Sequence, residues 1–307
     1  MTYSTFFELM TDVDTLYQAK KYQQAGAKLE TNLATFPHRR DTIFFWLINL
    51  YAHINKDRAI EIFREAIDDG YWYTSDALSY EDQDLKPLCE DSEYQRLRAI
   101  SIERYEAARA LTKPELNIYA SGDGPLPALI ALHGNYSNAE KATAQWTSVV
   151  DDGWLVAVPQ SSQIAGADQY VWNDSEISIS EVNAHYATLK ERGINEDQVF
   201  IGGFSMGGGL ALLLALANEI PARGYILVAP FLPELDTLDL SNLPAHARFY
   251  IFLGEKEHYS FEKVKKLAEM LRANGNEVQV EIRPDVSHEY PPDFPAALRG
   301  MLSFVAV

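Results

Sequence analysis

The fold of this chain is decided by one stretch, Val199-Phe200-Ile201-Gly202-Gly203-Phe204-Ser205-Met206-Gly207-Gly208-Gly209. A short apolar run ends at Gly203, a serine follows in a glycine-rich turn, and residues 210–217 continue as an apolar helix. Residues 203–207 fit the pattern G-x-S-x-G in the strand–turn–helix context that this motif requires. A turn this sharp strains the serine, and flanking glycines let strand and helix approach closely. The stretch therefore predicts a nucleophile, Ser205, at the start of a buried helix.

Strand and helix signals alternate on both sides of this stretch. Short apolar runs predict strands at 116–119, 128–132, 155–158, 199–201, 224–228, 249–253 and 278–282. Helices are expected near 138–150, 176–191, 206–219, 260–274 and 293–304. Continuous apolar strands of this kind are typical of a parallel sheet that helices bury on both faces. The predicted fold class is therefore α/β with a mostly parallel sheet.

The first third of the chain has a different pattern, which predicts helix throughout residues 5–110. A shift of 34 residues superposes Ala25 on Ala59, and this period resembles tetratricopeptide repeats. The tryptophan and glycine positions usual for such repeats are not kept, so a generic helical bundle is the alternative. The helical pattern stops near Pro114. Two domains are predicted, a helical, tetratricopeptide-like domain over 1–112 and an α/β domain over 113–307.

Composition excludes several classes of partner. The formal net charge of −18 would repel nucleic acid and anionic membranes. The most apolar run, after Ser205, is too short to span a bilayer. One cysteine, Cys89, excludes an internal disulfide, and the N-terminal residues lack the regions of a signal peptide. These features predict a cytoplasmic protein.

Catalytic groups of a parallel sheet lie on loops at the carboxyl ends of its strands. A serine hydroxyl needs a general base within hydrogen-bond reach. The last such loop carries His288, the predicted base, and the loop after the 249–253 strand carries a rival, His258. The residues that follow His133 and Gly134 form the predicted oxyanion loop, where His133 is expected to brace the backbone.

A carboxylate that fixes the tautomer of the base completes such a site. The loop after the 249–253 strand offers two, Glu255 and Glu257, and Glu257 is favoured because it lies further past the strand end. The less favoured acids are Asp285, Asp236 and Asp239.

A tetrahedral oxyanion needs two main-chain donors. One is expected to be the amide of Met206, directly after the nucleophile. The other is expected from Asn135 or, as second choice, Tyr136.

These residues give the second domain a resemblance to the α/β-hydrolase superfamily. Within it the chain looks most like the phospholipase/carboxylesterase group, which includes acyl-protein thioesterases. The resemblance covers about 115–307 and rests on 132–134, 203–208, Leu253-Gly254 with Glu257, and Ser287-His288. The order of serine, acid and histidine is also that of the superfamily. The resemblance implies a serine hydrolase that cleaves carboxylic esters or thioesters of small molecules through an acyl-enzyme, without cofactor or metal.

The chain departs from the group at two places. Gly254-Glu255-Lys256-Glu257 stands where the group usually has Gly-x-x-Asp, and Asn135-Tyr136-Ser137 replaces a loop that more commonly contains glycine and aspartate. Residues 169–174 resemble the tryptophan-containing loop that lines the pocket of relatives, so Trp172 is a pocket candidate, with core packing as its alternative. The remaining pocket candidates are Tyr136 and Phe231.

Two other functions remain open at this stage. The same catalytic residues serve peptidases and dienelactone-type hydrolases, and the chain is alternatively an interaction scaffold with a vestigial hydrolase domain. The helical domain is not part of the usual group. It is expected to cover the active-site mouth, to bind a partner protein, or to self-associate through residues 1–112.

Overall fold

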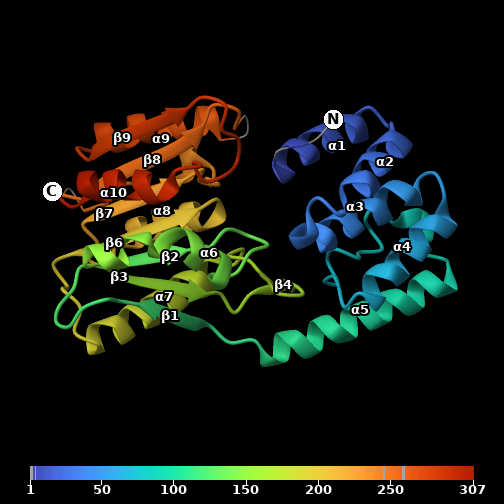
Figure 1. The fold of residues 1–307 in the computed structure, drawn as a ribbon, viewed down its shortest axis with the longest axis horizontal. Coiled ribbons are helices and arrows are strands. Elements are labelled where there is room, and N and C mark those ends of the chain that lie inside the picture. Colours follow the sequence, from blue (N-terminus) through green and yellow to red (C-terminus); the bar gives the residue numbers. More distant parts are fainter. Residues whose placement is uncertain (1–2, 4, 245, 258–259) are drawn as a thin grey trace. The chain divides into compact units, whose positions relative to one another are not determined.

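The computed structural model of the chain describes residues 3, 5–244, 246–257 and 260–307 (Figure 1). It forms two compact units. The first comprises Met1–Thr112 with Ile164–Ala167, and the second comprises Lys113–Gln163 with Asp168–Val307.

The first unit contains α1 (Phe6–Gln18), α2 (Tyr22–Asn32), α3 (Arg40–Ala52), α4 (Lys56–Asp68) and α5 (Ser92–Leu111). The helices α3 and α4 begin 34 residues after α1 and α2 respectively, so the period of the sequence coincides with a repeated pair of helices. Ala25 and Ala59 are fully buried at equivalent places in α2 and α4. Side-chain caps define the starts of α1, α4 and α5, as where Asn55 accepts a hydrogen bond from the Arg58 amide at 3.2 Å. The likeness to tetratricopeptide repeats stays a prediction.

The expectation of helix throughout 5–110 is wrong for residues 69–91, which form turns and a short 3₁₀ helix, η2 (Lys86–Leu88). Gly70, with φ 92°, follows the end of α4 in a left-handed conformation. Ser101 of α5 then bonds the main chain of Tyr73, accepting from its N–H at 2.7 Å and donating to its C=O at 3.1 Å. Apolar residues of this segment are fully buried although the segment is irregular, namely Leu78, Leu85 and Leu88.

The second unit is built on a sheet of strand order β1-β3-β2-β6-β7-β8-β9. Its strands are β1 (Glu115–Tyr119), β2 (Ala128–Leu132), β3 (Leu155–Gln160), β6 (Val199–Phe204), β7 (Gly224–Val228), β8 (Arg248–Gly254) and β9 (Glu277–Arg283). β1 runs antiparallel to β3, and the other pairings are parallel. The short strand β5 (Gln169–Tyr170) lies outside this sheet, and β4 (Ile164–Gly166) belongs to the first unit.

The central strands are buried on both faces, as their continuous apolar sequences predict. The expectation is wrong for the edge strands β1 and β9, whose residues are all exposed or half-buried. β9 is an edge strand that pairs with β8 alone, so helices cover it less completely.

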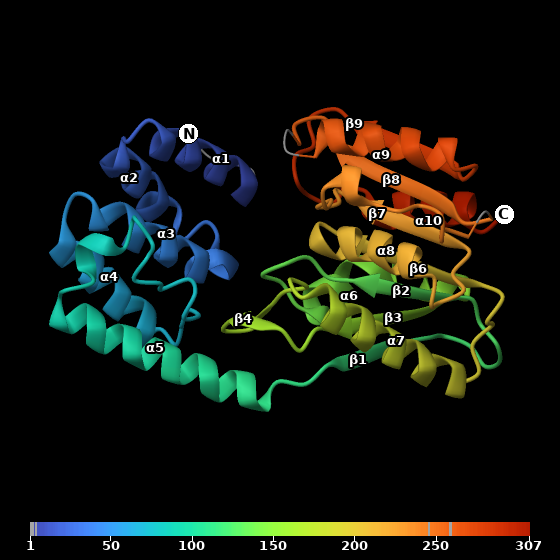
Figure 2. The ribbon, with the colours of Figure 1, turned by 180° about the vertical axis from the view of Figure 1, so that it is seen from behind.

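Helices cover the sheet in two layers (Figure 2). One core contains side chains of α7 (Ser175–Glu191), α8 (Met206–Ala217) and α9 (Phe261–Ala273). The core on the other face contains side chains of α6 (Ala139–Trp146), η3 (Thr147–Asp152) and α10 (Phe294–Val305). Trp146 packs so closely on β6 that a Cβ at Gly202 would lie 2.6 Å from its ring. This packing fixes β6, which leads into the turn at Ser205.

Replacing Ala59 by leucine is expected to lower the free energy of unfolding of the helical unit by about 1–3 kcal/mol, because the added methylenes enter a fully buried position. Denaturant unfolding of the full chain, followed by circular dichroism, measures the change. Ala107→Leu, on an exposed position of α5, is the matched control. Equal effects of the two substitutions would contradict the packing described for Ala59.

Candidate active site

Ser205 lies between the end of β6 and the start of α8, with φ 55° and ψ −119°. A positive φ strains a residue that has a Cβ, so the neighbouring structure must hold it. The Ser205 amide donates to Val228 O at 2.9 Å, and its carbonyl accepts from the amides of Phe231 at 2.9 Å and Gly209 at 3.0 Å. These main-chain bonds fix the serine at the carboxyl end of the sheet.

The glycines of the motif are explained by close backbone approach. A Cβ on Gly203 would overlap the carbonyl of Gly207, and a Cβ on Gly207 would overlap the carbonyl of His133. Gly134 is less constrained: a Cβ there would lie 3.0 Å from the Phe204 ring and in ordinary contact, at 3.4 Å, with the Ser205 Cβ. The loop that follows β2 is therefore packed directly against the serine turn.

The structure brings Ser205, His288 and Glu257 together. His288 Nε2 lies 2.8 Å from Ser205 Oγ, and the opposite ring nitrogen, Nδ1, is hydrogen-bonded to Glu257 Oε2. The Glu257 side chain is 1% exposed and that of His288 is 24% exposed. A buried carboxylate that accepts the Nδ1–H leaves Nε2 free of its proton, in the tautomer that can accept the serine proton.

The other carboxylates proposed from sequence lie elsewhere. Glu255 is exposed, and its amide donates to Arg283 O at 2.9 Å. The rival base His258 lies outside the described residues. The less favoured acids have other partners: Asp285 pairs with Lys256, Asp236 with Lys266, and Asp239 with the Ser241 amide.

The loops that carry Glu257 and His288 contact each other through their main chains. The amide of Lys256 donates to Val286 O at 2.9 Å, and a Cβ on Gly254 would overlap that same carbonyl. The sequence contains Gly254 but does not reveal that a strand end and a distant loop meet there. Phe204 was also missed as a support, and its ring centroid lies 5.1 Å from that of His288.

The two predicted oxyanion donors lie next to residues of the serine turn in different ways. Met206 is the first residue of α8, so its amide lacks an acceptor within the helix and lies at the positive end of the helix dipole. Asn135 lies between Gly134, which packs on Ser205, and Tyr136, which has a φ of 53°.

His133 and Trp172 support the loop that follows β2. Complete burial lowers the pKa of His133 to about 4, so the ring is neutral. Its Nδ1–H donates to Gly134 O at 2.8 Å, and its Nε2 accepts from the Ser161 amide at 3.4 Å. Trp172 Nε1 donates to His133 O at 2.8 Å. Trp172 is 3% exposed and packs in the core with side chains of α7 and α8, whereas Tyr136 and Phe231 are 51% and 57% exposed.

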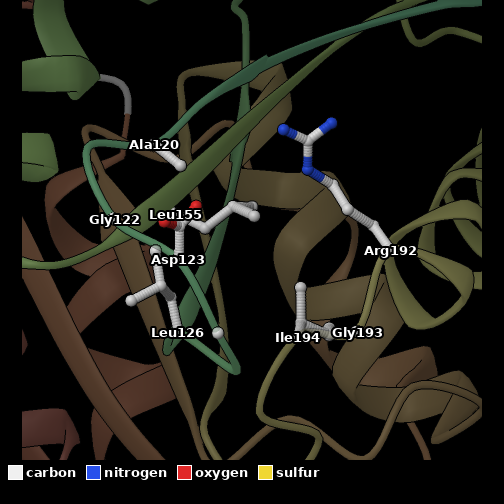
Figure 3. A pocket seen from close by; sticks show the side chains of 9 residues that line it. Ala120, Gly122, Asp123, Leu126, Leu155, Arg192, Gly193 and Ile194 are labelled. Atoms are coloured by element: carbon white, nitrogen blue, oxygen red, sulfur yellow. The ribbon is translucent and has the colours of Figure 1, made fainter.

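A hollow of about 280 Å³ lies away from these residues (Figure 3). It is formed at the amino ends of β2 and β3, whereas Ser205 lies at the carboxyl ends of the strands. Its lining consists of Ala120, Gly122, Asp123, Gly124, Leu126, Leu155, Arg192, Gly193 and Ile194. This hollow is therefore not part of the serine site.

Comparison with known proteins matches two different family models to two parts of the chain. Residues 5–109 match the family model A/B hydrolase-like, N-terminal domain, and residues 167–306 match Phospholipase/Carboxylesterase. Acyl-protein thioesterase 1 of Mycosarcoma maydis is 24% identical over 119 residues, covering 36% of this chain and 48% of that protein. The match thus spans about half the length of that curated relative.

Two solved structures have the same fold. An uncharacterized protein from Bacillus cereus ATCC 10987 is 27% identical, covers 98% of this chain and 98% of its own, and gives a TM-score of 0.55. A phospholipase/carboxylesterase from Dyadobacter fermentans DSM 18053 is 17% identical, covers 62% of this chain and 97% of its own, and gives a TM-score of 0.52. The predicted α/β-hydrolase fold and the likeness to the phospholipase/carboxylesterase group are confirmed. In the part of the chain that the structure describes, no helix is long and apolar enough to cross a membrane.

Burial of neutral His133 makes stability depend on pH. The unfolded ring, with a pKa of 6.5, binds a proton below that pH, whereas the folded ring does so only below about 4. The free energy of unfolding is therefore expected to fall by about 3 kcal/mol from this group as pH drops from 6.5 to 4. His133→Gln removes this contribution, so its unfolding free energy, measured in denaturant across that range, should fall less steeply than that of the wild type. Equal slopes for the two proteins would contradict the prediction.

Proposed function

We propose that this chain, which carries an A/B hydrolase-like N-terminal domain and a Phospholipase/Carboxylesterase domain, is a serine hydrolase of carboxylic esters or thioesters. The observation that carries the proposal is the hydrogen-bonded series Ser205 Oγ, His288 and buried Glu257. A serine becomes nucleophilic when a neutral imidazole can take its proton and a carboxylate stabilises the resulting imidazolium.

The residues of the site have distinct roles in the proposed reaction. Ser205 Oγ attacks the acyl carbon while His288 Nε2 takes its proton, and the amides of Met206 and Asn135 bind the oxyanion. His288 returns the proton to the departing alkoxide or thiolate, which leaves as alcohol or thiol. A water molecule then attacks the acyl-enzyme, His288 takes its proton, and the proton passes to Ser205 as the carboxylic acid is released.

Two exposed aromatic residues lie on loops whose main chain contacts the serine turn. The main chain of Phe231 bonds that of Ser205, and Tyr136 follows the proposed oxyanion donor. We assign both side chains to the substrate surface. The curated relative's name, acyl-protein thioesterase, makes a thioester a suitable test substrate beside an ester. A cytoplasmic location, and partner binding or self-association by residues 1–112, remain predictions from sequence.

Replacing Ser205 by alanine is expected to lower kcat on a p-nitrophenyl ester and on an acyl thioester by roughly 10⁴-fold or more, since the attacking atom is lost. A fluorophosphonate probe should label the wild type and not this variant. Undiminished turnover by the Ser205→Ala variant would contradict the proposal. If the probe does not label Ser205 of the wild type and the wild type cleaves neither substrate, the result would instead support the scaffold alternative.

The two glutamates give a matched pair of tests. Glu257→Gln keeps the size of a buried side chain but not its charge, so kcat should fall roughly 10³- to 10⁴-fold. Glu255→Gln changes an exposed residue, and its kcat should stay within about twofold of the wild type. Steady-state kinetics on one ester distinguishes them, and a loss centred on Glu255 would refute the assignment of the acid.

A further inference from the structure

The loop after β2 is bound along its length to the segment 168–173. Its residues and their partners run in antiparallel order, as in a two-stranded sheet, and Ser137 forms an isolated bridge with Tyr170. The conformation of this loop therefore depends on a segment more than thirty residues further along the chain. The bonds are Trp172 Nε1 to His133 O at 2.8 Å, Trp172 N to Asn135 Oδ1 at 2.8 Å, Tyr170 N to Ser137 O at 2.9 Å, and Asn138 Nδ2 to Asp168 Oδ2 at 2.8 Å.

The Asn135 side chain uses both ends of its amide in this contact. Its Oδ1 accepts from the main-chain N–H of Trp172 at 2.8 Å, and its Nδ2 donates to Asn173 Oδ1 at 2.7 Å. A planar amide held at both ends has little rotational freedom, so it also restrains the Cα to which it is attached. The main chain of Asn135 is thereby tied to the segment 168–173.

The next residue shows why the loop needs such a restraint. Tyr136 has a φ of 53°, which strains a residue with a Cβ by about 1–3 kcal/mol. A strained residue persists only where surrounding contacts hold it. The Asn135 side chain supplies contacts on one side of Tyr136, and the bond from Tyr170 to Ser137 supplies one on the other.

The restraint acts close to the reacting atoms. A Cβ on Gly134 would lie 3.4 Å from the Ser205 Cβ, so the amide of Asn135 follows a residue that already packs on the nucleophile. A donor that must meet the oxyanion at hydrogen-bond distance loses much of its effect when displaced by about 1 Å.

We propose that the Asn135 side chain is a positioning residue, which, through Trp172 and Asn173, holds its own main-chain amide where the oxyanion forms. The inference rests on the proposed hydrolase function and goes beyond it by assigning the side chains of Asn135 and Asn173. It also gives a reason for the departure of this loop from the glycine-containing version of the group. Here a side-chain amide, rather than glycine, maintains the unusual backbone.

The test compares variants at both ends of the contact. Asn135→Ala removes both hydrogen bonds and should lower kcat about 10- to 100-fold, with KM within about twofold, because the donor acts on the transition state. Asn173→Ala removes one bond and should have a smaller effect. Asn173→Asp keeps the acceptor and should restore kcat to near the wild-type value. Labelling of Ser205 by a fluorophosphonate should slow in parallel, since the phosphoryl oxygen uses the same donors.

Asn274→Ala is the matched control, because it removes a similar bond, from Asn274 Nδ2 to Asn276 Oδ1 at 3.0 Å, elsewhere in the unit. Its kcat should equal that of the wild type. An Asn135→Ala enzyme with wild-type kcat, or with its loss confined to KM, overturns the inference. If that variant does not fold, as judged by thermal unfolding, equal kcat for Asn173→Ala and Asn173→Asp overturns it. A wild type without Ser205-dependent turnover is a different result, which removes the proposed function and this inference together.

Discussion

The strained main chain of Ser205 is the constraint on which the rest of the structure depends. A φ of 55° is maintained by bonds to Val228, Phe231 and Gly209, which belong to β7, the loop after it and α8. The serine is therefore correctly placed only when β6 and β7 pair in register, with Phe204 opposite Val228, and when α8 packs on the sheet. Each of these requirements brings backbones into contact, which is why Gly203 and Gly207 have no room for a side chain.

Features encoded by neighbours in sequence were predictable, and features set by distant contacts were not. The apolar runs located the sheet strands because a strand buried on both faces needs an apolar residue at every position. The same argument failed for β9, since its exposure depends on its place at the edge of the sheet, which the run itself does not encode. Residues 69–91 show the same limit: apolar residues at helical spacing fill the core from turns, because Gly70 ends the helix and Ser101 satisfies the backbone of Tyr73.

Within the candidate site, the choice between Glu255 and Glu257 shows the limit of prediction from sequence. The two residues are close together on one loop, and the sequence offers only their distance from the strand end to choose between them. The surroundings of the two glutamates differ because Gly254 and Lys256 contact the main chain of Val286. Glu257, which follows this contact, is buried, whereas Glu255 is exposed. The pairing of Asn135 with Asn173 spans 38 residues and has no local signal at all.

Both sides of the site are thus held by loops that contact one another through their main chains. On one side, the contact with Val286 joins the loop of Glu257 to the loop of His288. On the other side, the segment 168–173 fixes the loop of Asn135. Ser205 lies between the two, and its own backbone is strained. Strain at one residue is stable only where neighbouring contacts hold it. The sheet carries both loop contacts and the serine turn, so all three depend on it.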